Sequence, residues 1–344
     1  MSKQNKEKER EMSDNIPSGA TPFKVDFSLD ITISVDELDS KNDAMGLKSF
    51  NEGIEAVAAK DKHGNVIGTN VKWSPDHDNG IKDELYIGTI KVPDLKYDND
   101  VINVYSILKR VNMAQGKRDP DGNPLIYALK QEKSYWFASE QDRIAVKTAM
   151  DKVIEEFIAK YFHDINSNSA TVVVIPSQVS KRGASLNSQF SSWFTRIAEK
   201  LGKKIVTYDK ALVKMTTEDF EYHVMDDPTS ALNKWLNSLS EDRANSIKSA
   251  LYNDLDVMDK KHNGLFSYHY VSNPETRNHI SSVMKTAGDE FYHDYCKNIN
   301  DEHVLVLDDT ISRGTSICDA CHALCSSYHP KTLTALTLFS PCCN

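Results

Sequence analysis

The chain has 344 residues, 40% of them hydrophobic, and this length suits two domains that each bury a core. Its 50 acidic residues outnumber the 41 basic ones, and the net charge of -9 argues against nucleic-acid binding through bulk electrostatics. No apolar run approaches the length of a membrane span, so we expect a cytoplasmic protein without membrane contact.

The chain is predicted to begin with a tail and to continue as a small β-rich region. Residues 1–21 are charged and poor in apolar groups, which is typical of a disordered tail. Between residues 23 and 92, short runs alternate apolar and polar side chains, and a turn at His63–Asn65 suits a hairpin. We therefore expect several short strands here.

Residues 22–165 are predicted to form one β-rich N-terminal domain of α+β type with a linking helix. Leu125–Leu129 and Tyr135–Ala138 are predicted as two further strands. Apolar side chains recur on one face of Glu140–Tyr161, which predicts a helix that packs on the rest of the protein. The three aromatic residues that open the second strand either stack on a base or are buried in the core, and burial is the commoner arrangement.

A strand, a polar loop and a helix are predicted in succession between residues 171 and 201. Thr171–Ile175 is a β-branched run, and Asn187 opens a stretch of helical periodicity. The polar residues of the loop between them include Ser177, Gln178, Lys181 and Arg182. Such a loop either binds an anion or is a solvated basic turn.

A long connection separates the strands that follow. Ile205–Tyr208 and Phe266–Val271 are predicted as the second and third strands, and 276–298 as mostly helical. Thr229–Asp259 carries helical periodicity, and residues 209–263 are predicted to be an inserted helical unit, with Lys214 at its entrance.

The sequence VLVLDDTISRGTS at Val304–Ser316 joins an aliphatic strand, two carboxylates and a hydroxyl-rich loop. The unbroken aliphatic run suits a central parallel strand covered on both faces. Asp308 and Asp309 would leave the sheet at its carboxyl edge, where they can accept hydrogen bonds from vicinal sugar hydroxyls. Around Gly314, backbone N–H groups can surround a phosphate at the start of a helix. The alternative, an ordinary turn and helix cap, does not require both acids.

A helix over Gly314–Ser327 and a last strand over Leu333–Phe339 complete the predicted elements. The alternation of strands and helices predicts a parallel α/β domain over residues 166–344. Three cysteines share one face of this last helix, and they are Cys318, Cys321 and Cys325. They either bind zinc or pack as small hydrophobic residues, and we expect packing in the core.

Val304–Ser316 resembles the phosphoribosyl pyrophosphate motif of type I phosphoribosyltransferases, in which an aliphatic strand runs into two acids and a threonine- and glycine-rich loop. The resemblance covers Ser169–Pro341 and implies a parallel-sheet phosphoribosyltransferase-like domain. By this resemblance the catalytic pair Asp308 and Asp309 holds the ribose hydroxyls, and magnesium (Mg2+) is bound through the ligand. The residues that would hold the 5-phosphate are Thr310, Ser312, Arg313, Gly314, Thr315 and Ser316.

The loop after Ile175 is similar to the pyrophosphate loop of the competence-associated branch of this family, with a proline, a basic pair, a glycine and an asparagine. The residues that the resemblance assigns to pyrophosphate are Ser177, Gln178, Lys181, Arg182 and Lys214. The resemblance also implies that the inserted unit at 209–263 is a lid that closes over the sugar, and helical packing without catalytic purpose is the alternative. The chain departs from the family at Arg313, where a small or hydroxyl residue is usual. It also has Ser312 where purine-salvage members carry a catalytic aspartate, so protonation of the leaving group is not carried over.

The implied activity is transfer of ribose 5-phosphate from phosphoribosyl pyrophosphate to a nitrogen acceptor, with release of pyrophosphate. The implied partners are this sugar diphosphate and a small-molecule base, with residues 22–165 as a candidate hood over the base, and a homodimer stays open. Two other functions also stay open. One is a non-catalytic sensor of sugar phosphates on the same fold, and the other is an effector that attacks nucleotides in a defence system.

Overall fold

The protein is described by a computed structural model of mixed α/β architecture. The described residues are 54–73, 86–92, 101–109, 124–130, 135–177, 185–277, 279–280, 283–287, 299–300, 302–310 and 314–340. The predicted tail at 1–21 lies outside them. No helix within these ranges has the length and apolar character needed to cross a membrane.

A six-stranded sheet of order β3-β4-β11-β10-β6-β7 forms the centre of the molecule. Only the edge strand β3 runs antiparallel to its neighbour, and the other five strands are parallel. The strands are β3 (Tyr86–Lys91), β4 (Val101–Lys109), β6 (Ser169–Val174), β7 (Lys204–Tyr208), β10 (His303–Thr310) and β11 (Thr332–Ser340). The prediction of an α/β fold built on a parallel sheet is confirmed.

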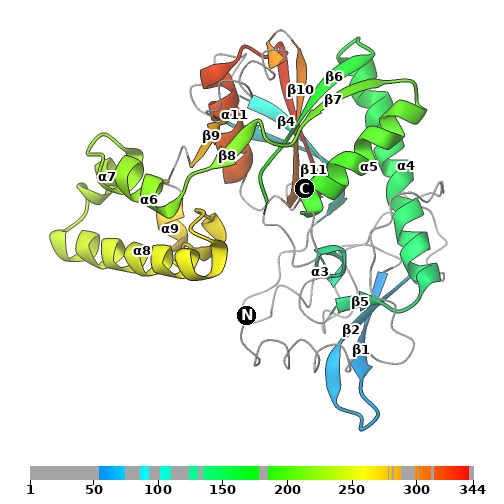
Figure 1. Ribbon diagram of the computed structural model, residues 1–344, viewed down its shortest axis with the longest axis horizontal. Helices are drawn as coiled ribbons and strands as arrows, with labels where there is room; N and C mark the ends of the chain where they lie inside the picture. The colour runs from blue at the N-terminus through cyan, green and yellow to red at the C-terminus, as the bar shows by residue number, and fades with distance from the viewer. Residues whose placement is uncertain are drawn as a thin grey trace.

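Helices cover both faces of this sheet (Figure 1). Alternate residues of β10 point to opposite faces, so Leu305 and Leu307 pack in one core and Val304 and Val306 in the other. The first core includes side chains of α3 (Pro124–Lys130), α4 (Glu140–Asp164) and α5 (Leu186–Lys200). The second includes α11 (Thr315–Ser327), whose cysteines pack in or against this core as predicted. The central strands are thus covered on both sides.

Capping residues define where two of these helices begin. The side chain of Ser139 accepts a hydrogen bond from the N–H of Asp142 at the start of α4. Ser185 does the same for the N–H of Ser188 at the start of α5, at 3.2 Å. Such caps satisfy amides that have no partner within the helix. The cap at Ser185 fixes the first turn of α5 beside the end of β6.

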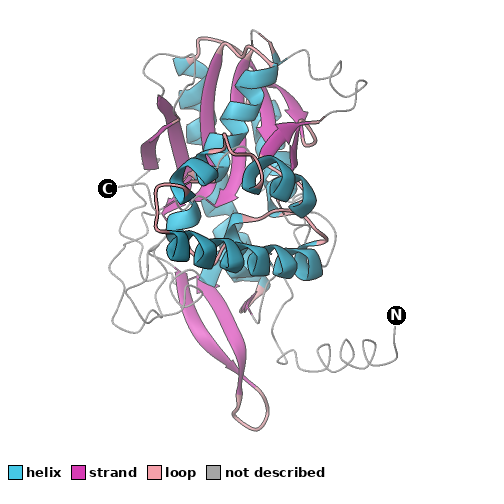
Figure 2. Cartoon of the chain, turned by 90° about the vertical axis from the view of Figure 1, so that its left-hand side faces the viewer, coloured by secondary structure: helices cyan, strands magenta, loops and turns pink. Residues whose placement is uncertain are grey.

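A second, three-stranded sheet extends from the other end of the molecule. It contains β1 (Ile54–Lys60), β2 (Val66–Trp73) and β5 (Tyr135–Phe137). β1 and β2 form the predicted hairpin, which projects away from the main sheet (Figure 2). Its turn is closed by Asp61, whose Oδ1 accepts from the N–H groups of His63 and Asn65 at 2.8 and 2.9 Å.

Residues 215–283, here called the helical unit, have their own hydrophobic core, which is built on stacked Phe220 and Phe266. The unit is reached through an antiparallel ribbon of β8 (Leu212–Lys214) and β9 (Met284–Thr286). Its elements are α6 (Thr217–Phe220), the π-helix η3 (Glu221–Met225), α7 (Ala231–Leu236), α8 (Glu241–His262), the 3-10 helix η4 (Tyr268–Tyr270) and α9 (Pro274–Arg277). The prediction of helices within 209–263 is confirmed, and the unit continues beyond residue 263.

Three predicted elements are wrong. Leu125–Leu129 is the helix α3 and not a strand, because its apolar residues are buried on several sides and so short a run has no readable period. Phe266–Val271 contains the 3-10 helix η4 and packs inside the helical unit, so it adds no strand to the main sheet. The segment 276–298 is not mostly helical in its described part, since α9 ends at Arg277 and β9 follows.

The N-terminal region also contributes to the main sheet. β3 and β4 pair with each other, and β4 pairs with β11 near the other end of the chain. The predicted boundary at residue 165 therefore cuts across one sheet, and β4 itself is not predicted from the sequence. The rest of the predicted division into domains stays a prediction.

Candidate functional site

The carboxyl edge of β10 carries two buried carboxylates. β10 pairs with β6 on one side and with β11 on the other, and its residues from His303 to Asp309 are all buried. Asp308 and Asp309 retain only 6% and 8% of their exposed surface. Ionisable groups removed from water to this extent require hydrogen-bonding or charged partners.

The side-chain amide of Asn187 connects Asp308 with the neighbouring strand. Asn187 lies in the first turn of α5, and its Nδ2 donates to the carbonyl of Ile175 at 2.8 Å and to Oδ1 of Asp308 at 3.0 Å. The backbone N–H of Asp309 donates to the same Oδ1 at 2.9 Å. Two donors therefore fix the carboxylate of Asp308 at the strand end.

Two lysines from distant parts of the chain face the acid pair. Lys130 is the last residue of α3, and its Nζ lies 2.8 Å from Oδ2 of Asp309. Lys214 ends β8 and interacts electrostatically with both carboxylates. Burial lowers the pKa of Lys214, and the negative charges of Asp308 and Asp309 oppose that shift. The site thus combines two carboxylates with two ammonium groups.

The pKa of Asp308 is raised to about 7. The largest cause is removal of the carboxyl from water, and the second is the negative charge of Asp309. The hydrogen bond from Asn187 and the positive charges of Lys214 and Lys130 act in the opposite direction. A ligand that offers hydroxyl donors to this carboxyl favours its ionised form, because hydrogen bonds to a carboxylate stabilise the charge.

Three buried polar atoms around this edge have no hydrogen-bond partner among the described residues. They are Oγ of Ser177, Oδ1 of Asn187 and Oγ1 of Thr310. Ser177 follows the end of β6 and Thr310 the acid pair, while the N–H of Ile175 donates to Leu307 and holds the two strand ends together. Buried polar atoms without partners are rare in folded proteins. A polar ligand bound at this edge could supply hydrogen-bond partners to all three atoms.

Gly314 and the start of α11 follow the acid pair in the chain. Gly314 has φ +80°, a left-handed conformation that suits glycine, and Thr315 begins the helix. No side chain among the described residues caps this N-terminus. A Cβ atom at position 314 would lie 2.5 Å from Cδ1 of Ile90 on β3. Uncapped amides at a helix start attract anions.

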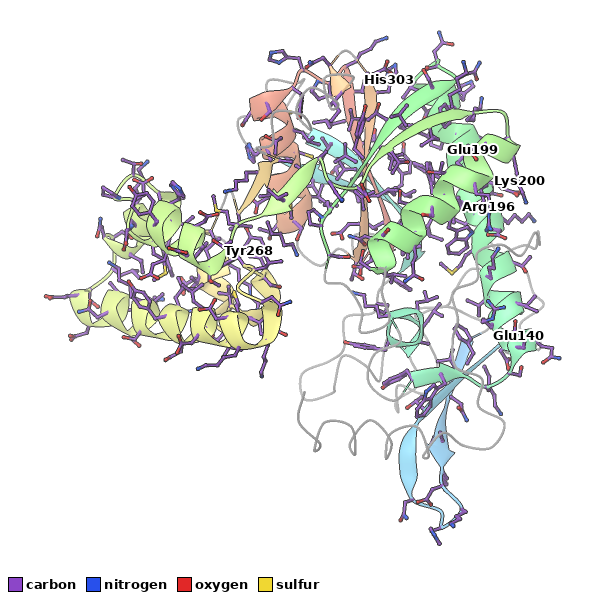
Figure 3. The ribbon with its side chains drawn as sticks, in the orientation of Figure 1. Glu140, Arg196, Glu199, Lys200, Tyr268 and His303 are labelled. Atoms are coloured by element: carbon purple, nitrogen blue, oxygen red, sulfur yellow. The ribbon has the colours of Figure 1, made fainter. Side chains whose placement is uncertain are left out.

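A buried hydrogen bond joins the helical unit to α11. The hydroxyl of Tyr268 donates to Oδ2 of Asp319 at 2.6 Å, and Asp319 is only 2% exposed. Figure 3 shows Tyr268 on the side of the helical unit that is nearest the main sheet. Burial and then the negative charge of Asp319 raise the pKa of Tyr268 well above its usual value, so this phenol keeps its proton.

The structure brings most of the described predicted site residues together. Asp308, Asp309 and Lys214 interact with one another, and Ser177 and Thr310 lie at the same strand ends. Thr315 and Ser316 lie in the first turn of α11, directly after Gly314. The remaining predicted site residues, which lie outside the described residues and stay predictions, are Gln178, Lys181, Arg182, Ser312 and Arg313.

The sequence-based site omits two contributing side chains. Asn187 could have been found from the sequence. An asparagine in the first turn of a helix that follows a strand and a polar loop is expected to lie at the end of that strand. Lys130 carries none, because it lies far from the acids in sequence and ends a segment that is predicted as a strand. The tertiary fold alone brings it to Asp309.

The carboxylate oxygens at this edge can hold magnesium only together with a bound ligand that supplies further oxygens. Magnesium prefers oxygen ligands, keeps several waters and is commonly held by one or two carboxylates together with substrate phosphates. Asp308 and Asp309 supply carboxylate oxygens, and one of them is already shared with Lys130. The described residues include no cluster of three or more side chains of the types that could hold a metal without a ligand.

Comparison with known protein families finds no family model that matches the chain, and a search of the curated proteins finds no match either. The function is therefore inferred from the motif and from the geometry around it.

Proposed function

We propose that the protein is a phosphoribosyltransferase that binds phosphoribosyl pyrophosphate at the carboxyl edge of the main sheet. The observation that supports this most is the buried pair Asp308 and Asp309 at the end of the central parallel strand, followed by Gly314 at positive φ and the start of α11. Open α/β sheets bind ligands at this edge. The pair suits the diol of a ribose, and the helix start suits its phosphate.

The sugar is held by groups that accept and donate hydrogen bonds at the strand ends. The 2- and 3-hydroxyls donate to the carboxylates of Asp308 and Asp309, whose burial makes each such bond stronger than it is in water. The hydroxyls of Thr310 and Ser177 acquire partners among the oxygens of the ligand. This gives hydrogen-bond partners to two buried hydroxyls that have none among the described residues.

The 5-phosphate and the pyrophosphate of the ligand both require positive surroundings. The 5-phosphate accepts hydrogen bonds from amides at the start of α11, beside Thr315 and Ser316. Lys214, together with Lys181 and Arg182 of the loop after β6, stabilises the pyrophosphate as negative charge grows on it. Magnesium, when it is bound through the ligand, neutralises part of the same charge.

The reaction is displacement of pyrophosphate at the anomeric carbon by a nitrogen nucleophile, through an oxocarbenium-like state. The contribution of the protein is to hold the sugar and to stabilise the leaving group, which are the roles that positioning and fixed charges can fill. A nitrogen acceptor that is already nucleophilic needs no strong general base. The proposal accordingly assigns no residue to that role.

Calorimetric titration of the full chain with phosphoribosyl pyrophosphate and magnesium tests the proposal. We expect saturable binding that requires magnesium, and pyrophosphate release when one member of a panel of nitrogenous bases is added. Absence of binding would overturn the proposal. Tight binding without pyrophosphate release from any base would instead assign the site to a sensor of sugar phosphates.

A further inference from the structure

Lys130 belongs to the part of the chain that precedes the motif-bearing half, yet it reaches the acid pair. Its Nζ lies 2.8 Å from Oδ2 of Asp309. The side chain of Lys130 is 25% exposed, and the side chain of Asp309 is 11% exposed. The ammonium is therefore held at the acid pair by a side chain that is not fully buried. A residue in this position can contact a ligand as well as the carboxylate.

The backbone of Lys130 is held in place by the core. The other apolar residues of α3 are buried in the core that this helix shares with α4, α5 and the sheet, and they include Leu125, Ile126, Ala128 and Leu129. Lys130 is the last residue of the helix and the only basic residue of its last turn. The position of its charge is therefore set by packing and does not depend on a flexible loop.

The two faces of the sheet separate the two ends of the proposed ligand. Gly314 approaches Ile90, which packs with α11 against the second core. Lys130 lies on α3, which packs with α5 in the first core, on the opposite face. The acid pair lies between them at the sheet edge. A sugar held by Asp308 and Asp309 with its 5-phosphate at α11 thus directs its other substituents toward the face of α3 and α5.

We propose that Lys130 binds the diphosphate of the sugar ligand while it holds Asp309. This inference rests on the proposed function and adds a binding residue from the N-terminal region to it. An ammonium has three N–H donors, so one group can hold a carboxylate and a phosphate oxygen together. α3 and α5 pack on the same face of the sheet, so Lys130 adds a positive charge on the α5 side of the acid pair.

The test compares a ligand that has the diphosphate with one that lacks it. Full-length wild type and Lys130→Met are titrated with phosphoribosyl pyrophosphate plus magnesium and, separately, with ribose 5-phosphate. Methionine keeps the apolar stem and removes the charge. We expect Lys130→Met to weaken binding of the diphosphate ligand at least about tenfold and to change binding of ribose 5-phosphate less than about twofold. Lys130→Arg, which keeps the charge, should recover most of the lost affinity.

Lys160→Met is the matched control, because Lys160 forms a similar ion pair with Asp164 at 2.7 Å on the exposed surface of α4. It should bind both ligands as the wild type does. Circular dichroism identifies variants that fail to fold, and Lys130→Gln then replaces Lys130→Met with the same expectations.

The alternatives give different results. An equal loss of affinity for both ligands would show that Lys130 only positions Asp309. Tighter binding of both ligands would show that Lys130 competes with the sugar for Asp309. Either result overturns the inference. Unchanged binding of both ligands also overturns it while leaving the proposed function intact. If the wild type binds neither ligand, both proposals fall together.

Discussion

Asp308 and Asp309 differ in their partners although they are adjacent in sequence. Asp308 accepts from Asn187 and from the backbone N–H of Asp309, whereas Asp309 pairs with Lys130. The carboxylates are therefore held by separate parts of the fold, Asp308 through α5 and Asp309 through α3. A change in either helix would therefore displace one carboxylate of the pair.

Replacing both acids by asparagine should abolish recognition of the sugar. Each charged hydrogen bond contributes about 1.5 to 3 kcal/mol, so Asp308→Asn combined with Asp309→Asn should weaken magnesium-dependent binding of phosphoribosyl pyrophosphate by several kcal/mol. Calorimetric titration measures the effect. A folded double variant that binds like the wild type would remove the acid pair from the site.

The raised pKa of Asp308 predicts a pH-dependent stability of the ligand-free protein. The folded state keeps a proton on Asp308 that the unfolded state releases at lower pH. The contribution of the protonated carboxyl to the free energy of unfolding is therefore fully present below the unfolded pKa and is lost as pH rises through about 7. Asp308→Asn keeps an oxygen that can accept from Asn187 and removes the charge. We expect it to raise the free energy of unfolding by on the order of 2 kcal/mol at about pH 8 and by much less at about pH 5.

Urea unfolding at the two pH values measures this effect, with Asp164→Asn on the exposed surface as the control. Equal stabilisation at both pH values would contradict the assigned cause. The expected combination of higher stability with lost binding is the usual trade-off at a site whose charges are held for a ligand.

The residue scale also separates what the sequence can predict from what it cannot. Asp308, Asp309 and Thr310 follow directly from a local pattern of strand and acids, and the structure places them at the carboxyl edge of a buried strand. Lys130 is brought there by the packing of α3, which involves side chains from α4, α5 and several strands. A contact that depends on tertiary packing produces no local pattern in the sequence from which it could be predicted.

At the scale of elements, the start of α11 at Gly314 is sterically constrained. The φ of +80° at position 314 is unfavourable for alanine, and the Cβ atom of Gly314→Ala would lie against Ile90. The substitution should therefore also shift the backbone amides that are proposed to bind phosphate. We expect ribose 5-phosphate binding to be lost while the far-UV circular dichroism spectrum is retained. Titration with ribose 5-phosphate measures the loss.

Gly202→Ala is the control for backbone strain. Gly202 has φ +71° after α5, and a Cβ atom there meets nothing within 4 Å. This variant should lose about 1 kcal/mol of stability and no affinity for ribose 5-phosphate. Loss of binding in both variants would attribute the effect to destabilisation, and normal binding by Gly314→Ala would place the phosphate elsewhere.

The hydrogen bond between Tyr268 and Asp319 joins the helical unit to α11, the helix that follows Gly314. Tyr268→Phe removes this donor from a buried carboxylate and should destabilise the attachment by about 1 to 3 kcal/mol. We expect faster hydrogen exchange across residues 215–283, measured by mass spectrometry. Tyr222→Phe, at a residue that is 70% exposed, should leave exchange unchanged. Unchanged exchange in Tyr268→Phe would mean that other contacts hold the unit.

The elements differ in how well the sequence predicts them. Glu140–Asp164 is long and has a clear cap, so both its type and its start are predictable. The buried helix Pro124–Lys130 and the segment Phe266–Val271 are too short for a period to decide between helix and strand. Their conformation is set by the cores in which they pack.

At the scale of the whole molecule, the main sheet unites both ends of the chain. β3 and β4 come from the N-terminal region, and β11 joins them to the strand that carries the acids. Strand type can be inferred from local patterns, whereas the order of strands depends on contacts between residues far apart in sequence. For this reason the sequence predicts a parallel α/β domain and misplaces the boundary of its sheet.

The position of β11 has a consequence for synthesis on the ribosome. Ser106 on β4 contacts the carbonyl of Leu338 on β11, 232 residues further along the chain. Until residues 332–340 have left the exit tunnel, β4 and β10 each have one edge without a neighbouring strand. We therefore expect a nascent chain stalled before Thr332 to be digested within residues 101–109, and a chain stalled well after Ser340 to resist protease there.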